Sequence, residues 1–421
     1  MHLKLLHTAD WHLGQSFHGF ERDYEHAAFL DWLIQQIGIT KPDVLCIAGD
    51  IYDSVNPPAT AQRRFFNFLA NAHTCHPPLQ IILIAGNHDA AARLEAPAPL
   101  MESHNTRVVG TVSRLPDGEI DYQKLLVPLK NAAGVTSAIA ILAPFLRPAD
   151  LPQVPQTTDS YQGGIQEFYR RATEAAVELR SSLHPEAAII GLGHLHMQNA
   201  SESRDSERRI VIGGAEAVTE SAFPESLSYV ALGHLHKPQS LANGRIRYSG
   251  SPIPLSFSEK DYQHSILELC FDGESLQNAT PIVTPIPIPK AVPLLRLPTK
   301  GALPIHELLL QIDETSFGDS LTPETFPFLE IRVLDDGPDP TRRNRIEKAL
   351  AGKPVRLTSI RLESPSRPET LVAPAFSTIT TDLANLDPEQ ILIEAHRERF
   401  QKEPDPSLLE SLREIRQSCQ L

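Results

Sequence analysis

The sequence lacks any apolar run close to the length of a membrane-spanning helix. Such a helix needs about 20 predominantly apolar residues, and no segment of this 421-residue chain approaches that length. The first residues, MHLKLLHTADWH, also lack the long apolar core of a secretion signal. The composition, with 41% hydrophobic and 21% charged residues, is typical of a soluble globular protein. We therefore expect a cytoplasmic protein.

Cysteine is also scarce. The four cysteines, at positions 46, 75, 270 and 419, lie far apart and form neither a CxxC motif nor a paired spacing. This pattern argues against a disulfide framework and against a zinc site built from thiolates. We expect the four side chains to be reduced thiols.

Positive charge is in deficit. The chain has 38 Lys and Arg residues against 52 Asp and Glu residues, so its formal net charge is −14. A protein that binds nucleic acid unaided normally presents a basic field to the phosphates. If the substrate is DNA, metal ions or a partner must supply the positive charge.

Short β-rich runs alternate with amphipathic segments from the first residue to about residue 288. Continuous apolar strands that are bounded by glycine and separated by helices are typical of a layered α/β domain with a buried sheet. The strand-like runs are residues 3–10, 43–50, 79–87, 137–144, 187–194 and 229–234, and the helical ones are residues 24–37, 60–72 and 165–183.

A proline-dense segment at residues 281–304 predicts a domain boundary. Strand-like and helical runs alternate again beyond it, which predicts a small α/β module. Two later segments each begin with Asp-Pro, an N-cap followed by proline at the first helical position. A short amphipathic hairpin of this kind docks either on its own domain or on a partner. We expect three domains, at residues 1–285, 286–370 and 371–421.

The chemistry-bearing residues follow the strand-like runs. Five strand endings carry Asp, Asn or His side chains: HTADWHLG, CIAGDIYD, LIAGNHDA, GLGHLH and ALGHLH. In four of them a glycine precedes the polar residue, and the other, HTADWHLG, places Asp10 and His12 two residues apart. Ligands bind beyond the carboxyl ends of the strands in an open α/β sheet, so these side chains should gather at one edge. The two-residue period of a strand points His234 and His236 the same way.

Oxygen and nitrogen donors without a thiolate suit manganese, iron or zinc. The set is too large for one ion and suits two ions with one bridging carboxylate. Two ions about 3.5–4 Å apart can hold the oxygens of a phosphoester and activate water near neutral pH. The strand endings therefore indicate phosphoester hydrolysis.

The same residues, in order along the chain, resemble the motifs of the calcineurin-like metallophosphoesterases. These motifs are D-x-H (Asp10, His12), GDIYD (Asp50), GNHD (Asn87, His88, Asp89), a later histidine (His194) and GHLH (His234, His236). The surrounding segments LHTADWHLGQ, YVALGHLHKPQ, RYSGSP and SFSEKDYQHSILEL are similar to the SbcD family, the nuclease subunits of bacterial SbcCD complexes. The likeness to SbcD covers residues 1–269.

The resemblance implies a β-sandwich flanked by helices, with a small α/β capping domain and C-terminal helices that bind a partner ATPase. It implies that Asp10, His12 and His236 hold a first ion, that Asn87, His194 and His234 hold a second, and that Asp50 bridges both. His88 would contact the scissile phosphate and act as general acid, oriented by Asp89. A proton donor beside two cations needs such a carboxylate to hold it in place.

The resemblance also implies the activity and the partners. We expect two divalent ions, with Mn²⁺ as the expected metal, 3′-to-5′ exonuclease activity on double-stranded DNA, and endonuclease activity on hairpins or single strands. These activities serve DNA repair, recombination and replication. The expected partners are DNA, an SbcC-type ATPase and a second nuclease subunit within a heterotetramer, with no membrane contact.

Several alternatives stay open at this point. The acidic balance slightly favours a stand-alone phosphatase or cyclic-nucleotide phosphodiesterase, and a scaffold with an inactive site is a further possibility. His196 is an extra histidine that could exchange roles with His194. Asp53 could be a ligand, although a brace for its loop fits better. The arginines at 342, 343 and 345 could contact DNA or form a solvated helix face.

Overall fold

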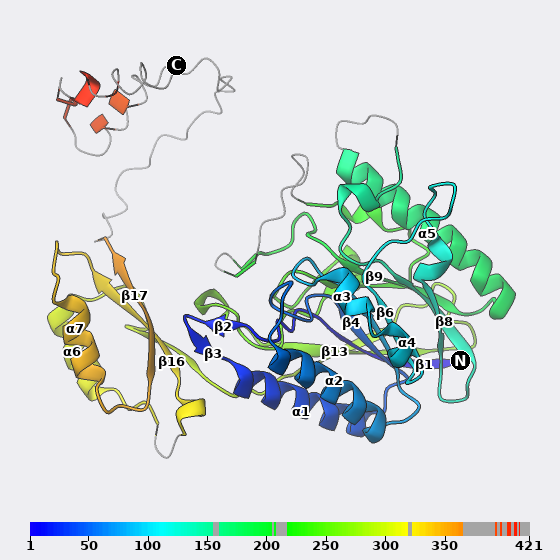
Figure 1. Cartoon of the computed structure of the whole chain (residues 1–421), viewed down its shortest axis with the longest axis horizontal. Helices are drawn as coiled ribbons and strands as arrows, with labels where there is room; N and C mark the ends of the chain where they lie inside the picture. Colours follow the sequence, from blue (N-terminus) through cyan, green and yellow to red (C-terminus); the bar gives the residue numbers. More distant parts are fainter. Residues whose placement is uncertain are drawn as a thin grey trace. The chain divides into compact units, whose positions relative to one another are not determined.

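The computed structural model describes residues 1–154, 160–203, 206–207, 217–318 and 322–364, and the short pieces 392–393, 396–397, 402–405, 408–410 and 412. Met1–Ser364 forms one compact unit and Pro365–Leu421 a second. All elements described below belong to the first unit (Figure 1). Most of the two expected terminal helices falls outside the described residues.

Six strands form the first sheet, in the order β14-β13-β1-β4-β5-β6. Strands β1, β4, β5 and β6 run parallel, and β13 and β14 extend the sheet in antiparallel fashion. The bounds are β1 (His2–Thr8), β4 (Val44–Ala48), β5 (Gln80–Ile84), β6 (Thr106–Val109), β13 (Ser265–Asp272) and β14 (Ile282–Pro287).

A second six-stranded sheet has the order β11-β12-β10-β9-β8-β7. Its central strands β8, β9, β10 and β12 are parallel. The bounds are β7 (Leu126–Lys130), β8 (Thr136–Leu142), β9 (Ala188–His194), β10 (Tyr229–Gly233), β11 (Gln239–Leu241) and β12 (Ile246–Tyr248). The two LGHLH segments therefore end neighbouring parallel strands, with Gly233 paired to His194.

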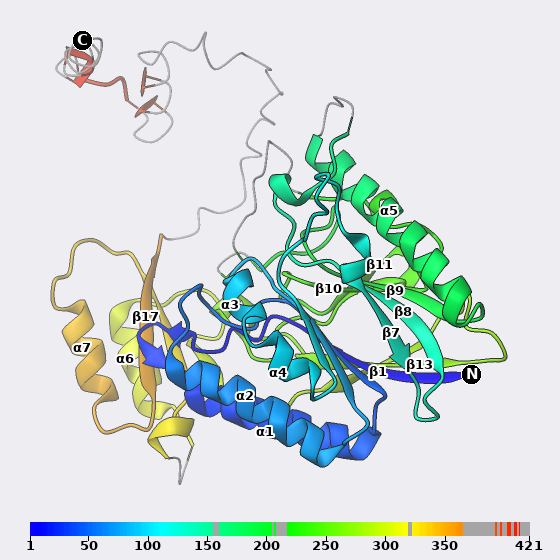
Figure 2. The ribbon, with the colours of Figure 1, turned by 45° about the vertical axis from the view of Figure 1, so that its right-hand side comes forward.

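The two sheets pack face to face, since β4 and β5 contact β8, β9 and β10 (Figure 2). Side chains alternate along each strand, as the two-residue period requires. In β4, Val44 and Cys46 belong to the apolar core that includes residues of the second sheet. Leu45 and Ile47 belong instead to the core beneath the helices. The expected β-sandwich is confirmed.

Helices cover the outer faces of the sandwich. α1 (Asp23–Thr40) and α2 (Ala59–Cys75) pack on each other and supply Phe29, Phe65 and Phe68 to the core of the first sheet. α5 (Ser160–Leu183) lies on β8 and β9 of the second sheet. Trp11 packs edge-on against Phe68, with ring centroids 5.2 Å apart. This fully buried ring anchors the loop that carries Asp10 and His12.

The small α/β module predicted beyond the proline-dense segment has its own sheet and core. Its parallel strands lie in the order β15-β16-β17, and α6 and α7 pack on them. The bounds are β15 (Leu294–Leu297), α6 (Ile305–Glu314), β16 (Phe328–Leu334), α7 (Arg342–Leu350) and β17 (Arg356–Glu363). The three domain boundaries remain predictions.

An aromatic cluster joins this module to the sandwich. Phe328 of β16 contacts Phe17, with ring centroids 5.0 Å apart, and Phe17 contacts Phe257 at 5.3 Å. Phe17 lies on the hairpin of β2 (Ser16–Phe17) and β3 (Phe20–Glu21).

Two short helices, α3 (Ala91–Glu95) and α4 (Ala98–Glu102), pack beside β6 of the first sheet.

The arginines on α7 all face acidic side chains. Arg342 bonds to Asp336 at 2.9 Å, Arg343 to Glu347 at 2.7 Å, and Arg345 lies 3.5 Å from Asp339. Arg342 is buried, so it belongs to neither a solvated face nor a DNA surface, whereas Arg343 is exposed and Arg345 is half-buried. A contact of these last two side chains with DNA stays an open alternative.

Two expectations from composition can be compared with the structure. Cys46, Cys75 and Cys270 are free thiols, and the cysteine at position 419 lies outside the described residues. Among the helices that the structure describes, none has the length and apolarity that crossing a membrane demands.

Candidate metal centre

The predicted ligands lie at the carboxyl ends of five parallel strands. Asp10 and His12 follow β1, Asp50 follows β4 and Asn87 follows β5 in the first sheet. His194 ends β9 and His234 and His236 follow β10 in the second sheet. Because the two sheets pack face to face, their carboxyl edges bring both groups of side chains into one site.

The backbone at several of these positions is held in an unusual conformation. Asp10, His12, Asp50 and His234 have φ values of 55°, 47°, 48° and 100°. A non-glycine residue in this region costs about 1–3 kcal/mol, and such residues persist where the surrounding structure demands them. Strain of this kind is typical of functional sites, and here it falls on four of the predicted ligands.

Asn87 and Asp50 connect the two groups of ligands. The Oδ1 atom of Asn87 lies 3.0 Å from His194 Nε2 and 3.2 Å from His234 Nδ1. The Oδ2 atom of Asp50 lies 3.4 Å from His194 Nε2 and 3.6 Å from His12 Nε2. Asp50 therefore occupies the central position that a bridging carboxylate requires.

The remaining predicted ligands, Asp10 and His236, lie next to those already described. Asp10 Oδ1 accepts a hydrogen bond from the backbone N–H of His234 at 2.8 Å. The ring of His236 lies 5.2 Å from that of His12. The structure thus brings all seven predicted ligands into one cluster, in which Asn87 is half-buried and the other six are buried: Asp10, His12, Asp50, Asn87, His194, His234 and His236.

The residues present fit a pair of divalent cations. Within the described residues, Asp10 Oδ2 is buried and makes no hydrogen bond. The two ring nitrogens of His12 also make none, although they lie 3.3 Å from the Asp53 carboxylate and 3.6 Å from the Asp50 carboxylate. Such an orphaned polar atom costs about 1–3 kcal/mol unless a ligand satisfies it. Asp10, His12 and Asp50 also place ligand atoms within 4.8 Å of one another. Carboxylate and imidazole donors of this kind suit manganese, iron or zinc.

The electrostatics of the cluster favour a cation. Burial raises the pKa of Asp10 to about 6. Burial acts to lower the pKa of His194, but the carboxylates of Asp50 and Asp10 and the carbonyl oxygen of Ala48 together raise this pKa to about 9. The two carboxylates therefore draw positive charge into a buried site, which is the property that binding of a divalent ion requires.

Two glycines, Gly86 after β5 and Gly233 at the end of β10, allow close contact between the strand ends that carry the ligands. A Cβ atom on Gly86 would lie 2.1 Å from Asp50 Oδ1, and one on Gly233 would lie 2.0 Å from the carbonyl oxygen of Ala48. No side chain fits at these two positions without moving its neighbours.

The substitution Gly86→Ala is expected to displace the Asp50 carboxylate and to lower phosphodiester cleavage by about 10²-fold, as a shift of about 1 Å at a reacting site does. Gly191→Ala on β9 is the matched control, because its nearest neighbour would lie at an ordinary contact distance of 3.5 Å. Steady-state assays of both variants with Mn²⁺ measure the difference. Wild-type activity in Gly86→Ala would contradict this account of the site.

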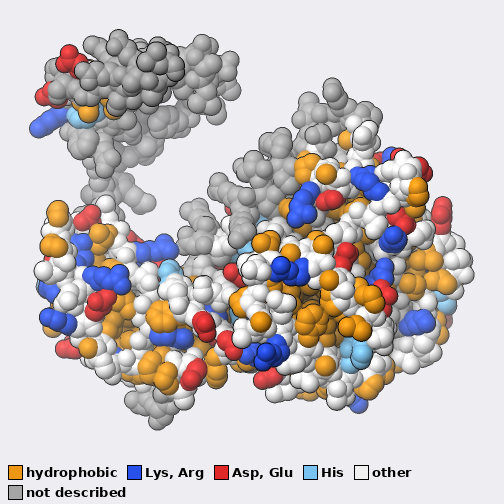
Figure 3. Space-filling view, in the orientation of Figure 1, with side chains coloured by type: hydrophobic (Ala, Val, Ile, Leu, Met, Phe, Trp, Pro, Cys, Tyr) orange, Lys and Arg blue, Asp and Glu red, His pale blue; other side chains and the backbone are white. Residues whose placement is uncertain are grey.

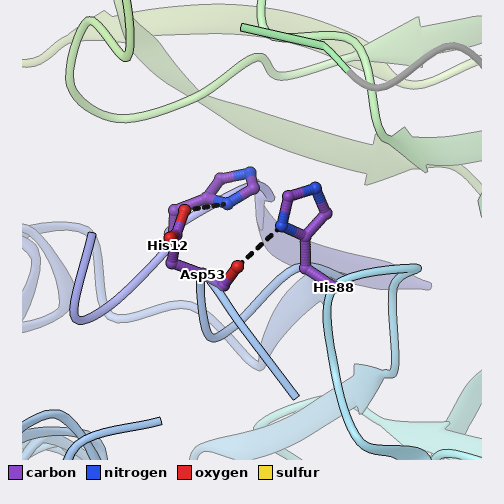
Figure 4. A group of neighbouring side chains, drawn as sticks. All are labelled: His12, Asp53 and His88. Atoms are coloured by element: carbon purple, nitrogen blue, oxygen red, sulfur yellow. Dashed lines mark hydrogen bonds and ion pairs between the residues drawn. The ribbon is translucent and has the colours of Figure 1, made fainter. Parts of the chain in front are cut away.

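His88 lies beside the cluster on the loop after β5 (Figure 4). Its Nδ1 atom donates to the backbone carbonyl oxygen of Asp53 at 2.8 Å, and its ring lies 4.7 Å from that of His12. Its backbone N–H donates to Asp50 Oδ1 at 2.9 Å. The bond to Asp53 orients the His88 ring and fixes the proton on Nδ1.

The carboxylate of Asp89 is buried between two loops of the site. Its carboxylate accepts hydrogen bonds from the backbone N–H groups of Ile51, Tyr52 and Gly86, at 3.1, 2.9 and 2.9 Å. Asp89 thus ties the loop after β5 to the loop after β4. That Asp89 orients His88 stays a prediction; the Nδ1 atom of the His88 ring meets the backbone carbonyl oxygen of Asp53.

Asp53 makes contacts within the site that the sequence did not indicate. Besides its carbonyl contact with His88, its Oδ1 atom lies 3.3 Å from His12 Nδ1. Asp53 therefore contacts two histidines of the site, which goes beyond the expected role of bracing its own loop. The D-x-x-D spacing in GDIYD is the one sequence signal that could have indicated this role.

His196 lies at the edge of the site. Its Nε2 atom is 3.3 Å from Glu202 Oε1, and its ring is 6.3 Å from that of His234. His194, by contrast, contacts both Asp50 and Asn87. His194 is therefore the histidine of this pair that faces the predicted ion sites.

Comparisons with known proteins agree with this geometry. Residues 3–238 match the calcineurin-like phosphoesterase family, and residues 290–400 match the type 5 capsule protein repressor C-terminal domain. The SbcD subunit of the SbcCD nuclease from Rhodobacter capsulatus is 38% identical over 394 residues, covering 93% of this chain and 94% of the relative.

More distant relatives carry the same name. The SbcD subunit from Escherichia coli K12 is 29% identical and covers 90% of both chains. That from Bacillus subtilis is 35% identical, covering 63% of this chain and 65% of the relative. The chain therefore belongs to the calcineurin-like phosphoesterase family, in the group formed by the SbcD subunits of SbcCD nucleases.

Proposed function

We propose that this chain is a two-metal DNA nuclease subunit that hydrolyses phosphodiester bonds in DNA repair and recombination. The observation that carries the proposal is the placement of Asp50 between two groups of buried donors at the carboxyl edges of two packed sheets. The proposed activities are 3′-to-5′ exonuclease on double-stranded ends and endonuclease on hairpins or single strands. The proposed compartment is the cytoplasm.

The proposed ligands divide into two sets. Asp10, His12 and His236 would hold one ion, Asn87, His194 and His234 would hold the other, and Asp50 would contribute to both sets. When bound, a divalent pair, proposed as Mn²⁺, supplies Lewis acidity toward the phosphate and a nucleophile at neutral pH.

His88 supplies the proton for the leaving 3′ oxygen. Because its Nδ1–H donates to the Asp53 carbonyl oxygen, its Nε2 atom is the one that can carry a second proton toward the substrate. Both contacts of His88, to Asp53 and through its backbone to Asp50, hold the ring in a fixed position before substrate binds. General acids placed in this way contribute about 10²–10⁴-fold to rate.

DNA is the favoured substrate, because the relatives of this chain are nucleases by name. The test compares purified protein with Mn²⁺ on hairpin DNA and on a nitrophenyl phosphodiester. Cleavage of the hairpin supports the proposal. Hydrolysis of the small ester with no cleavage of DNA, even with the ATPase added, would instead identify a stand-alone phosphatase or cyclic-nucleotide phosphodiesterase.

An SbcC-type ATPase is the proposed partner, with two nuclease subunits in a heterotetramer. On the face drawn in Figure 3, Lys and Arg side chains of the described residues are intermixed with Asp and Glu rather than gathered into one basic patch. Together with the net charge of −14, this supports a partner that contributes to DNA binding.

Residues 371–421 are proposed to bind this ATPase. A chain that ends at residue 370 is expected to keep full hydrolysis of the nitrophenyl ester and to lose co-purification with the ATPase, because Met1–Ser364 forms a compact unit that holds the whole site. Size-exclusion chromatography of the mixed subunits measures this. Co-elution of the shortened chain with the ATPase would place the contact elsewhere.

A further inference from the structure

Glu259 is a fully buried carboxylate next to a predicted metal ligand. Its side chain has no exposed surface, and its Oε1 atom lies 2.9 Å from His236 Nδ1. It belongs to the segment SFSEKDY, which the proposed catalytic mechanism does not use. Its place in the turn before β13 puts it at the same edge of the first sheet as Asp10, because the start of β13 pairs with the end of β1.

The position of this carboxylate is fixed independently of His236. Glu259 Oε2 accepts a hydrogen bond from the backbone N–H of Leu255 at 2.8 Å, and Ser206 donates to Oε1. The backbone N–H of His236 is held separately, by Glu207 Oε1 at 2.7 Å. His236 is therefore held at two points, its backbone N–H group and the Nδ1 atom of its ring.

Burial of an ionised carboxylate is costly unless it is paired with positive charge. Among the described residues, His236 is the one ionisable group that forms an ion pair with Glu259. The other partners of Glu259 are neutral hydroxyl and N–H groups. The carboxylate therefore needs a positively charged imidazole, or an imidazole that is bound to a cation through its other nitrogen.

The other site histidines provide a comparison. His194 Nδ1 contacts the backbone carbonyl oxygen of Ala48 at 2.9 Å, which is a neutral acceptor. His12 Nδ1 lies 3.3 Å from the carboxylate of Asp53, which is about one-third exposed. His236 is the histidine whose Nδ1 atom meets a carboxylate that is both fully buried and at hydrogen-bonding distance.

We infer that Glu259 is a positioning residue for the metal pair. Its carboxylate accepts a hydrogen bond from the Nδ1–H group of His236, which leaves the Nε2 lone pair of that ring to bind the ion. A carboxylate behind a ligand histidine fixes the tautomer and the orientation of the ring and makes it a stronger donor. This inference rests on the proposed ligand set, in which His236 holds one of the two ions.

The test measures metal affinity rather than cleavage. The full-length chain is stripped of metal and titrated with Mn²⁺ by isothermal calorimetry, as wild type and as Glu259→Gln. The Gln side chain keeps the size and a neutral acceptor but loses the charge. One of the two ions is expected to bind about 10–100-fold more weakly, as happens when such a partner is removed, and the other to keep its affinity.

Glu330→Gln is the matched control. Glu330 is also a fully buried carboxylate, but its partners are Arg296, Arg332 and Arg361 in the small module. This variant is expected to lose thermal stability and to keep wild-type affinity for both ions. A general effect of removing a buried charge would instead weaken Mn²⁺ binding in both variants, and that result would overturn the inference.

A second variant covers the case in which Glu259→Gln does not fold. Glu259→Asp keeps the charge, so its Mn²⁺ affinity is expected to lie closer to wild type than that of Glu259→Gln or Glu259→Ala. Wild-type affinities for both ions in Glu259→Gln or in Glu259→Ala would overturn the inference. A wild-type chain that binds no Mn²⁺ would overturn the proposed metal pair itself, which is a separate outcome.

Discussion

The substitution Asp50→Ala is expected to remove both metal ions and to lower DNA cleavage by more than about 10³-fold. For comparison, removal of a single hydrogen-bond donor to a transition-state oxyanion lowers the rate by about 10²–10³-fold. The reason is the central position of this carboxylate. Asp50 Oδ2 faces His12 of one ligand set and His194 of the other, so neither ion keeps its full set without it.

Elemental analysis of the purified variant measures the metal content, and cleavage of hairpin DNA measures the rate. Asp43→Ala is the matched control, because Asp43 is also a largely buried aspartate but lies at the opposite end of β4, where its carboxylate accepts a hydrogen bond from the backbone N–H of Lys4 at 2.8 Å. The control is expected to keep both ions. Retention of two ions by Asp50→Ala would show that this residue does not bridge them.

The substitution His88→Ala is expected to keep both ions and to lower DNA cleavage by about 10²–10⁴-fold, the usual contribution of a general acid. His88 contacts the cluster through its backbone and through Asp53, and its ring is outside the proposed ligand sets. Loss of the ring therefore removes a proton donor without removing a metal ligand.

The leaving group distinguishes this role from a structural one. A nitrophenolate leaves without protonation, whereas the 3′ oxygen of DNA does not, so His88→Ala should affect the nitrophenyl ester much less than DNA. His264→Ala is the control, since that ring is also buried with its Nδ1 atom on a backbone carbonyl, at 2.7 Å from the oxygen of Ser251. An equal loss on both substrates in His88→Ala would exclude proton donation to the leaving group.

The gathering of the ligands could be predicted from the sequence because it depends on local rules. Asp10, Asp50 and Asn87 each lie two or three residues beyond the end of a strand, and parallel strands share one carboxyl edge. The pairing of those strands into two sheets could not be predicted from periodicity, which does not show which strands are neighbours. The resemblance to the calcineurin-like family supplied the β-sandwich.

The contacts behind the ligands could not be predicted in the same way. Glu259 and His236 are separated along the chain by two strands, and their contact depends on how the turn before β13 meets the end of β10. The expected pairing of His88 with Asp89 followed from their adjacency in GNHD. In the structure the Asp89 carboxylate also accepts hydrogen bonds from N–H groups of the neighbouring loop, and the carbonyl oxygen of Asp53 meets the His88 ring.

The most direct test of the central claim is a crystal structure of the chain soaked with Mn²⁺, with the ions located by anomalous scattering. We expect two peaks, one bound by Asp10, His12 and His236 and the other by Asn87, His194 and His234, with Asp50 bound to both. A single peak, or peaks away from these side chains, would contradict the claim.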